Sequence, residues 1–401
     1  MESDSRSGNP RLLVLGAGPA QLGLLEAARD RGLWLAVVDR DPGAPGFRFA
    51  DRRCILSTED EPAIDRLVSA LSIDGLIAPG TDWPVGVAAR IAERSGLSHP
   101  ISSRTAVLAT NKLRQRERLL EADVPQPRWW VVGGDETAPE VTFPVVVKAP
   151  DRQGQKGLSL VEEPAALEPA IETARSAARG GLALVEERVD GPEVTVVGFS
   201  RDGHFTPLVV TDRIVAGPPA FGVALAHVWP SHNGGESADV AGAAVAALGI
   251  ENGPSYTQLR LSADGPRVIE VAARLGGGHD AELAQAVTGV DLNGLAIDAA
   301  LGNPTLAPSW HKPRVGGAVT RFLIAPPGIL ESVDVPDGLD GVARVRVYRE
   351  PGYVVVPLRR GSDRAGAVLA VGDSREEALA RADSAASGIV FHTATEPALA
   401  Q

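Results

Sequence analysis

The chain has 401 residues, of which 44% are hydrophobic and 22% charged, and its formal net charge at pH 7 is -12. This composition is typical of a soluble globular protein, and the length predicts about two to four domains. The acidic balance argues against nucleic acid or an anionic membrane as the main partner. A single cysteine excludes an intrachain disulfide, and no apolar run could span a membrane, so we expect a cytoplasmic protein.

The first part of the chain alternates strands and helices. Residues 1–9 are polar, and we expect a disordered tail there. A buried strand at 11–16, a helix at 22–31 and a strand at 34–39 follow, and the alternation continues to about residue 105. We therefore expect a small, doubly wound α/β domain over 10–105.

The first turn of this domain is similar to a dinucleotide-binding fingerprint. Gly16-Ala-Gly18 follows a strand and precedes a helix, and Asp39 ends the next strand, where a ribose ligand is expected. The third glycine of the fingerprint is replaced by Gln21, so the spacing is broken. An NAD-dependent oxidoreductase is therefore an alternative that this turn supports only weakly.

Lysine is rare in this chain. Of the 39 basic residues, only Lys112, Lys148, Lys156 and Lys312 are lysines. Since arginine carries the ordinary surface charge, a lysine here indicates a need for a compact ammonium, for example against a phosphate. Three of the four fall within 112–156, which makes that interval a candidate phosphate-binding region. Surface lysines with solvated head groups are the alternative.

The second region contains these lysines. We expect a helix at 105–122 that carries Lys112. Strands are expected at 129–132, 143–148, 158–161 and 182–189, with a helix at 166–179. Lys148 ends one of these strands, and a polar turn with Gly154, Lys156 and Gly157 follows it. A hairpin tip with free backbone N–H groups and a lysine indicates a flexible flap over phosphates, and an ordinary solvated hairpin is the alternative.

Two later strands bring a carboxylate opposite an amide. Strands at 256–262 and 267–271, turned by Ala263-Asp-Gly265, are expected to pair antiparallel. Gln258 and Glu270 then face each other on one side of the sheet, and their oxygens suit a hard cation such as Mg²⁺.

The segment after Glu270 suits an anion. Arg274 offers a guanidinium, and Gly276, Gly277 and Gly278 allow a backbone to approach a ligand closely. An ion pair followed by a flexible turn is the alternative. Further helices are expected at 238–248, 280–287 and 291–301, and a β-rich tail with a helix at 374–387 ends the chain.

Taken in order, these segments resemble the ATP-grasp superfamily, and within it the carboxylate–amine ligases that include bacterial amino-acid (dipeptide) ligases. The resemblance covers about residues 11–395. Its motifs are Gly16-Ala-Gly18, Asn111-Lys112-Leu-Arg-Gln-Arg116, Pro144-Val-Val-Val-Lys148, Gln153 to Gly157, Glu186-Glu-Arg-Val189 with Gly191-Pro-Glu193, and Pro351-Gly-Tyr353.

The resemblance implies an ATP-grasp fold in four parts. These are a Rossmann-like N-terminal domain at 10–105 that binds no dinucleotide, an ATP-grasp lid region at 106–187, an ATP-grasp catalytic region at 188–312, and an α+β, amino-acid-ligase-like C-terminal domain at 313–401. It also implies ATP and Mg²⁺ (or Mn²⁺) as cofactors and a homodimer.

The resemblance assigns a role to each candidate residue. The phosphates would be bound by Lys112, Lys148, Lys156, Gly154 and Gly157, adenine by Glu186 and Val189, and the ribose by Glu193. Arg188 would also contact the nucleotide, and Gln258 and Glu270 would bind the metal. Arg274 and the glycines 276–278 would stabilise an acyl phosphate and the tetrahedral intermediate. His227, His279 and Asp280 are candidates for handling the proton of the amine, with His279 favoured because it abuts the glycines.

Two positions depart from the family pattern. Ala272 stands where the family usually has an asparagine metal ligand, which predicts weakened or rearranged coordination. Ala224 stands near a glutamate that contacts the substrate amino group in some amino-acid ligases, which puts a free α-amino acid in the activated position in doubt.

The sequence thus predicts an ATP-dependent ligase that joins a small carboxylic acid to an amine through an acyl phosphate, releasing ADP and phosphate. A specialised biosynthetic pathway is the expected setting, and neither nucleic acid nor membrane is an expected partner. A carboxylase of the biotin or purine type and a non-catalytic nucleotide-binding protein are the alternatives, besides the oxidoreductase.

Overall fold

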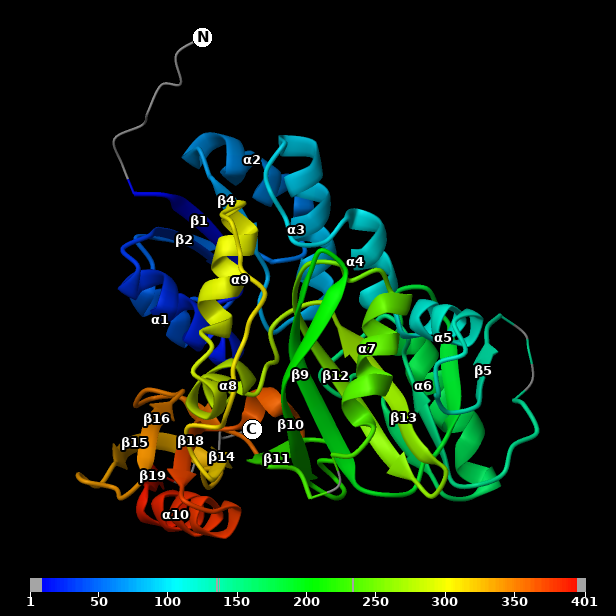
Figure 1. Ribbon diagram of the computed structural model, residues 1–401. Coiled ribbons are helices and arrows are strands. Elements are labelled where there is room, and N and C mark those ends of the chain that lie inside the picture. Colours follow the sequence, from blue (N-terminus) through cyan, green and yellow to red (C-terminus); the bar gives the residue numbers. More distant parts are fainter. Residues whose placement is uncertain (1–8, 135, 137, 233, 395–401) are drawn as a thin grey trace, which may run out of the picture.

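The computed structural model describes residues 9–134, 136, 138–232 and 234–394. The expected tail at 1–9 therefore lies outside the described residues, except for Asn9. Within the described part, no helix is long and apolar enough to cross a membrane. Figure 1 shows the N-terminal strands and helices at one corner, the elements around residues 129–187 on the opposite side, and the C-terminal elements below the N-terminal ones.

The N-terminal sheet has four parallel strands in the order β3-β2-β1-β4. They are β1 (Arg11–Leu15), β2 (Trp34–Asp39), β3 (Arg52–Ile55) and β4 (Gly75–Ile77). Alternate residues of β1 face opposite ways: Leu13 and Leu15 pack with helices α2 (Glu61–Leu71) and α3 (Asp82–Ser95), and Leu12 and Val14 pack with α1 (Leu22–Asp30). Both faces are covered, which explains the uninterrupted apolar run of the strand and confirms the expected α/β class.

A second sheet has four antiparallel strands in the order β5-β8-β6-β7. The strands are β5 (Trp129–Val132), β6 (Val145–Lys148), β7 (Ser159–Val161) and β8 (Ala183–Glu187). Helix α6 (Leu167–Ala177) covers it, with Ile171 packed against Val145 and Val147 in one buried cluster. Because β6 and β8 are antiparallel, Lys148 at the end of β6 lies opposite Leu184 near the start of β8, and Glu186 lies opposite Val146.

The largest sheet has eight strands in the order β13-β12-β9-β10-β11-β14-β18-β16. Its strands are β9 (Glu193–Arg201), β10 (His204–Val215), β11 (Ala224–Trp229), β12 (Gly253–Ser262), β13 (Gly265–Ala272), β14 (Gly317–Leu323), β16 (Val342–Val347) and β18 (Gly366–Gly372). The pairing of β11 with β14 carries the sheet across the expected boundary at 312/313, so the catalytic and C-terminal regions share one sheet.

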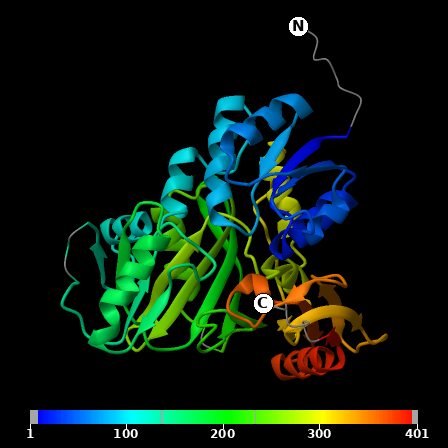
Figure 2. The same ribbon diagram turned by 180° about the vertical axis from the view of Figure 1, so that it is seen from behind.

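Helices and a small sheet complete the fold (Figure 2). The helices are α7 (Ser237–Ala247), α8 (Asp280–Thr288), α9 (Leu292–Leu301) and α10 (Arg375–Gly388), and β15 (Gly328–Asp334), β17 (Val354–Val355) and β19 (Val390–Ala394) form the small sheet in the order β17-β15-β19. Short 3₁₀ turns lie at Pro19–Gln21, Pro45–Phe49, Pro164–Ala166 and Gly361–Asp363.

The expected single helix at 105–122 is wrong. The structure has two helices there, α4 (Ser103–Ala109) and α5 (Lys112–Glu121). Asn111 is extended, and its side chain accepts a hydrogen bond from Arg114 N at 3.2 Å, which caps the start of α5. The apolar periodicity runs through this segment without a break, but the Asn111 cap starts a new helix. Lys112 is therefore the first residue of that helix.

Helix α9 packs on β4 and joins the N-terminal sheet to the rest of the molecule. The contact is close because β4 has Gly75 at this point: a Cβ there would lie 2.8 Å from the backbone oxygen of Ala300 and 2.8 Å from Leu301 Cδ2. We predict that Gly75→Ala lowers the free energy of unfolding by about 1–3 kcal/mol through overpacking, as measured by denaturant titration.

Gly217→Ala is the matched control, since a Cβ at Gly217 would meet nothing within 4 Å. Equal stability of the two variants would contradict this account of the interface.

Candidate active site

One cavity of about 610 Å³ lies between the N-terminal domain, the sheet β5-β8-β6-β7 (the lid sheet) and the eight-stranded sheet. It is lined by most of the residues that the sequence singled out, from elements far apart in the chain. These residues are Lys112, Lys148, Gly154, Lys156, Glu186, Arg188, Val189, Glu193, His227, Gln258, Glu270, Arg274, Gly277 and Gly278.

Four of the candidates do not line the cavity: Gly157, Gly276, His279 and Asp280. The His279 side chain is only 6% exposed, with Nε2 2.5 Å from the Tyr348 hydroxyl and Nδ1 3.3 Å from a Glu282 oxygen. Both ring nitrogens of His279 are therefore engaged away from the cavity, contrary to the expectation that the residue beside the glycines faces the substrate.

The strand that carries Glu270 is bulged. In the pairing of β12 with β13, Gln258 lies opposite Glu270, but Leu259 lies opposite Val268, so Ile269 is the extra residue. A bulge leaves backbone groups unpaired and changes the direction of neighbouring side chains. Here it frees the Ile269 carbonyl oxygen.

Helix α5 binds this edge strand. Gln115 donates to the carbonyl oxygen of Val271 at 2.8 Å and accepts from Val271 N at 3.0 Å, as a neighbouring strand would. Arg116 donates to the carbonyl oxygens of Val268 at 2.9 Å and Ile269 at 2.7 Å. Residues Gln115 and Arg116 of the 111–116 motif thus bind backbone groups at the free edge of β13, a role that was not predicted from the sequence.

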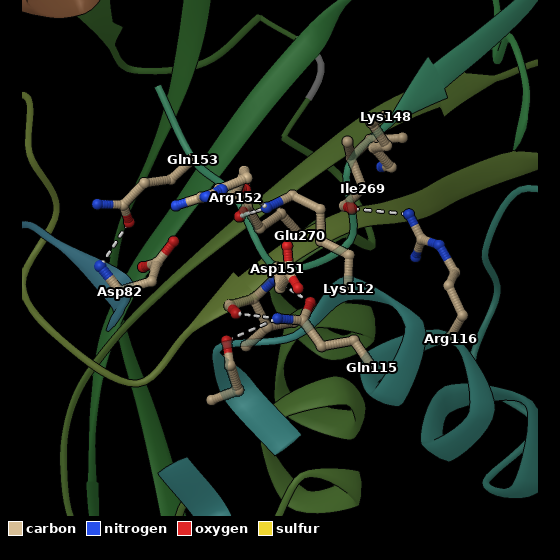
Figure 3. A network of polar contacts seen from close by, with 12 residues as sticks. Asp82, Lys112, Gln115, Arg116, Lys148, Asp151, Arg152, Gln153, Ile269 and Glu270 are labelled. Atoms are coloured by element: carbon tan, nitrogen blue, oxygen red, sulfur yellow. Dashed lines mark hydrogen bonds and ion pairs between the residues drawn. The ribbon is translucent and has the colours of Figure 1, made fainter. Parts of the chain in front are cut away.

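Lys112 and Glu270 form an ion pair at the centre of the site (Figure 3). Their Nζ and Oε1 atoms are 2.8 Å apart, and Nζ also donates to the Arg152 carbonyl oxygen at 2.9 Å. Burial opposes both charges, but the Lys112 ammonium lowers the pKa of Glu270 to about 2, and the Glu270 carboxylate raises the pKa of Lys112. Both groups are therefore charged at neutral pH.

Lys148 and Arg116 hold Glu186 between them. Lys148 Nζ lies 2.7 Å from one carboxylate oxygen and Arg116 Nε 2.7 Å from the other, and both Arg116 and Glu186 are nearly inaccessible to solvent. Burial would raise the pKa of Glu186, but the charges of Arg116 and Lys148 lower it. Burial lowers the pKa of Lys148 to about 8, against the opposing effect of Glu186.

Glu193 is the centre of a second polar cluster. Its Oε1 atom forms an ion pair with Arg213 and accepts a hydrogen bond from the side-chain amide of Gln258, and Arg260 lies 3.4 Å from Oε2. Arg213 and Arg260 were not among the predicted residues. Their positions on β10 and β12 become informative only when the order of strands in the sheet is known.

Arg274 is held by Asp82, another residue that the sequence analysis missed. Its Nη2 and Nε atoms lie 2.5 Å and 2.6 Å from Asp82 Oδ1. The backbone N–H of Asp82, at the start of α3, donates to the side-chain oxygen of Gln153 at 2.5 Å, which ties the glycine turn to the N-terminal domain (Figure 3). No sequence signal links Asp82 to Arg274, because 192 residues separate them.

His227 lines the cavity beside the glycines. It is 2% exposed, with Nδ1 3.3 Å from Asp280 Oδ1, and a Cβ at Gly278 would lie 2.8 Å from its Nε2. Burial lowers the pKa of His227 to about 4. Its imidazole is therefore neutral at pH 7.

The oxygens of Gln258 and Glu270 fit a magnesium ion that phosphates help to hold. Within the described residues, no group of three His, Cys, Asp or Glu side chains could enclose a metal. One carboxylate and one amide oxygen lie on the cavity wall, and Mg²⁺ is commonly bound by one or two protein oxygens together with substrate phosphates and water.

The Gln21 side chain occupies the space beside the glycine turn of the N-terminal domain. A Cβ at Gly16 would lie 2.9 Å from Gln21 Cδ, and Gln21 donates to the Pro79 carbonyl oxygen at 2.5 Å. Asp39 accepts hydrogen bonds from the backbone N–H groups of Ala17 and Asp41. The residue that breaks the fingerprint thus occupies the turn.

Two family models match the chain. Residues 133–307 match the carbamoyl-phosphate synthase L chain, ATP binding domain, and residues 321–394 match the L-amino acid ligase C-terminal domain 2. The two models together cover both the lid and the C-terminal region.

Two proteins represent the similar sequences. The uncharacterized protein y4rH of Sinorhizobium fredii is 32% identical over 286 residues, which are 67% of this chain and 58% of that protein, so this chain spans less than two thirds of its length. Formate-dependent phosphoribosylglycinamide formyltransferase of Burkholderia pseudomallei is 28% identical over 423 residues, 97% of this chain and 98% of that protein.

Solved structures show the same fold over nearly the whole chain. L-amino acid ligase from Bacillus licheniformis has a TM-score of 0.81 at 23% identity, covering 96% of this chain and 99% of that one. The biotin carboxylase domain of Hydrogenobacter thermophilus 2-oxoglutarate carboxylase, in complex with MgADP, ADP and bicarbonate, has a TM-score of 0.79 at 18% identity, covering 95% and 90%.

The chain has the ATP-grasp fold. Within that superfamily, it resembles the L-amino acid ligases in the fold and in its C-terminal segment.

The pKa of Lys148 gives a test of its predicted contact with phosphate. As pH rises through about 8, the ammonium loses its proton and its charge. We predict that the Kd for ATP, measured by calorimetry, rises about tenfold between about pH 7 and pH 9. In Lys148→Arg the guanidinium stays charged, so the Kd should be nearly constant over this range. A wild-type Kd that does not change with pH would contradict the assignment.

Proposed function

We propose that this protein is an ATP-dependent carboxylate–amine ligase that forms an amide bond between two small molecules and releases ADP and phosphate. The observation that carries the proposal is the meeting of Lys112, Lys148, Glu270 and Arg274 in one cavity, from α5, β6 and β13 with the loop that follows β13. The two family models and the fold support it. A bound magnesium ion would screen the charge of the phosphates.

The nucleotide would lie at the end of the cavity formed by the lid sheet. Lys148 and Lys112 supply positive charge for phosphates, and the turn 153–157 covers them. The segment 186–189 comprises the last two residues of β8 and the two that follow them, and Glu186 and Val189 would contact adenine there. Since both Glu186 oxygens already bind cations, an adenine amino group would share the carboxylate with Arg116 and Lys148.

The chemistry would proceed in two steps. An oxygen of the acid attacks the γ-phosphorus of ATP, so that ADP leaves and an acyl phosphate forms. The amine then attacks the acyl carbon, phosphate leaves, and the nitrogen loses a proton. Arg274, fixed by Asp82, and the backbone of Gly277 and Gly278 would stabilise the negative charge that develops on the oxygens.

His227 takes the place of His279 in this proposal. It faces the cavity, is neutral at pH 7 and has Asp280 Oδ1 3.3 Å from its Nδ1, whereas both nitrogens of His279 are engaged elsewhere. A neutral imidazole can accept the proton that the attacking amine loses.

The names of two similar proteins are in line with this class of reaction. One is an L-amino acid ligase, and the other is a formyltransferase that depends on formate, a small carboxylic acid. A screen over panels of acids and amines can identify the substrates of the present chain.

Release of ADP tests the proposal. We predict ADP from ATP and Mg²⁺ only when a suitable acid and amine are both present, screened over panels of each. Lys148→Ala should lower the rate at least about a hundredfold, because it removes a charge that holds the phosphates. Lys312→Ala removes a lysine outside the cavity and should keep the wild-type rate.

ATP binding without ADP release under any combination would instead support the non-catalytic alternative. Equal rates for the Lys148→Ala and Lys312→Ala variants would contradict the assigned site.

A further inference from the structure

His279 directly follows the three glycines in sequence, yet it has no part in the reaction steps proposed above. Its backbone is left-handed, with φ of 60° and ψ of 29°, where the chain passes from the glycines into α8. A residue with a Cβ is strained in this conformation, although histidine adopts it more often than most residues do. Such strain persists only where the surrounding structure holds the residue in place.

Two polar side chains hold the ring of His279. The Tyr348 hydroxyl lies 2.5 Å from Nε2, and a Glu282 oxygen lies 3.3 Å from Nδ1. Burial would raise the pKa of Glu282, but His279 and Arg346 lower it to about 2. The Glu282 carboxylate is therefore charged and can only accept hydrogen bonds, so Nδ1 of His279 carries a proton. These two contacts fix the orientation of the ring.

The same contacts reach the N-terminal and C-terminal domains. Arg346, on β16, lies 3.2 Å from Glu282 Oε1 and 2.6 Å from a carboxylate oxygen of Glu26, on α1. Helix α1 also packs directly against the Glu282 carboxylate, because a Cβ at Gly23 would lie 2.1 Å from Oε1. The start of α8 is thereby anchored to α1 and to β16, which belong to different domains.

The glycines before His279 face the cavity. Gly277 and Gly278 line it, and the backbone N–H of Gly278 donates to Asp280 Oδ2 at 3.0 Å. A Cβ at Gly278 would lie only 2.8 Å from His227 Nε2. A shift of this backbone would therefore change the contacts of Asp280 and His227. The buried side chain of His279, which does not line the cavity, opposes such a shift.

We propose that His279 is a positioning residue that fixes the backbone of Gly277 and Gly278 where it meets the reacting carboxyl group. Tyr348 and Glu282 hold His279 in this role. The inference rests on the proposed function, because the reaction is the one assigned to this cavity. Backbone groups that are held in place stabilise developing charge without reorganisation, so loosening them should slow the chemical steps more than it weakens substrate binding.

Kinetics after removal of one hydroxyl group test the proposal. Tyr348→Phe loses the contact with His279 and keeps the ring, which packs in a buried cluster. In the ADP assay at saturating amine, this variant should lower kcat about tenfold and leave the KM for ATP and for the acid within about twofold. Tyr353→Phe is the matched control: it removes a hydroxyl from an exposed tyrosine outside the cavity and should keep the wild-type kcat.

A second variant tests whether Tyr348 acts through His279. Asparagine tolerates the left-handed conformation but lacks the ring that reaches Tyr348, so His279→Asn should also lower kcat at least about tenfold. The double variant should be no slower than His279→Asn alone, because both changes remove the same contact. Losses that multiply in the double variant, or a raised KM with unchanged kcat in Tyr348→Phe, would contradict the proposal.

Amide hydrogen exchange separates this inference from a failure of the ligase proposal, since it needs no turnover. With a non-hydrolysable ATP analogue and Mg²⁺ present, the peptide containing 276–283 should exchange at least about tenfold faster in Tyr348→Phe than in wild type or Tyr353→Phe. Unchanged exchange there, or faster exchange with unchanged kcat, would overturn the inference. Faster exchange without ADP release from any variant, wild type included, would instead contradict the ligase function and leave the anchoring of the glycines intact.

Discussion

The site depends on one buried group of charges, Arg116, Glu186 and Lys148. Glu186 on β8 and Lys148 at the end of β6 form an ion pair within the lid sheet, and Arg116, which also pairs with Glu186, binds the backbone of β13 in the large sheet. Two sheets are thereby joined at the strand that carries Glu270. Removing one member would leave a buried charge without a partner, which is far more costly than losing a surface ion pair.

The charge pattern explains how an acidic chain can bind anions. The arginines and lysines that line the cavity outnumber its carboxylates, and those carboxylates are used to position cations, as Asp82 positions Arg274 and Glu270 positions Lys112. A fixed cation in a partly desolvated site interacts more strongly with phosphate than an exposed one does. Most of the acidic residues that set the net charge lie outside the cavity wall.

Local patterns predicted much of the fold. The strand and helix alternation, the hairpin of Gln258 and Glu270, and the fold class came from periodicity, turn residues and motif order. The break between α4 and α5 did not, because a single asparagine cap decides it. The roles of Gln115, Arg213 and Asp82 could not be predicted either, because each depends on which distant strand or helix lies beside it. His279 shows the same limit: adjacency to the glycines in sequence did not mean adjacency to the cavity.

In the proposed reaction, the carboxylate is activated by transfer of the γ-phosphoryl group of ATP to one of its oxygens. The most direct test uses the acid identified by screening, labelled with ¹⁸O in both carboxylate oxygens, together with unlabelled ATP and the amine. If an acyl phosphate forms and the amine attacks its carbon, each released phosphate carries one ¹⁸O, which mass spectrometry detects. Phosphate without ¹⁸O, released together with the amide, would contradict the account.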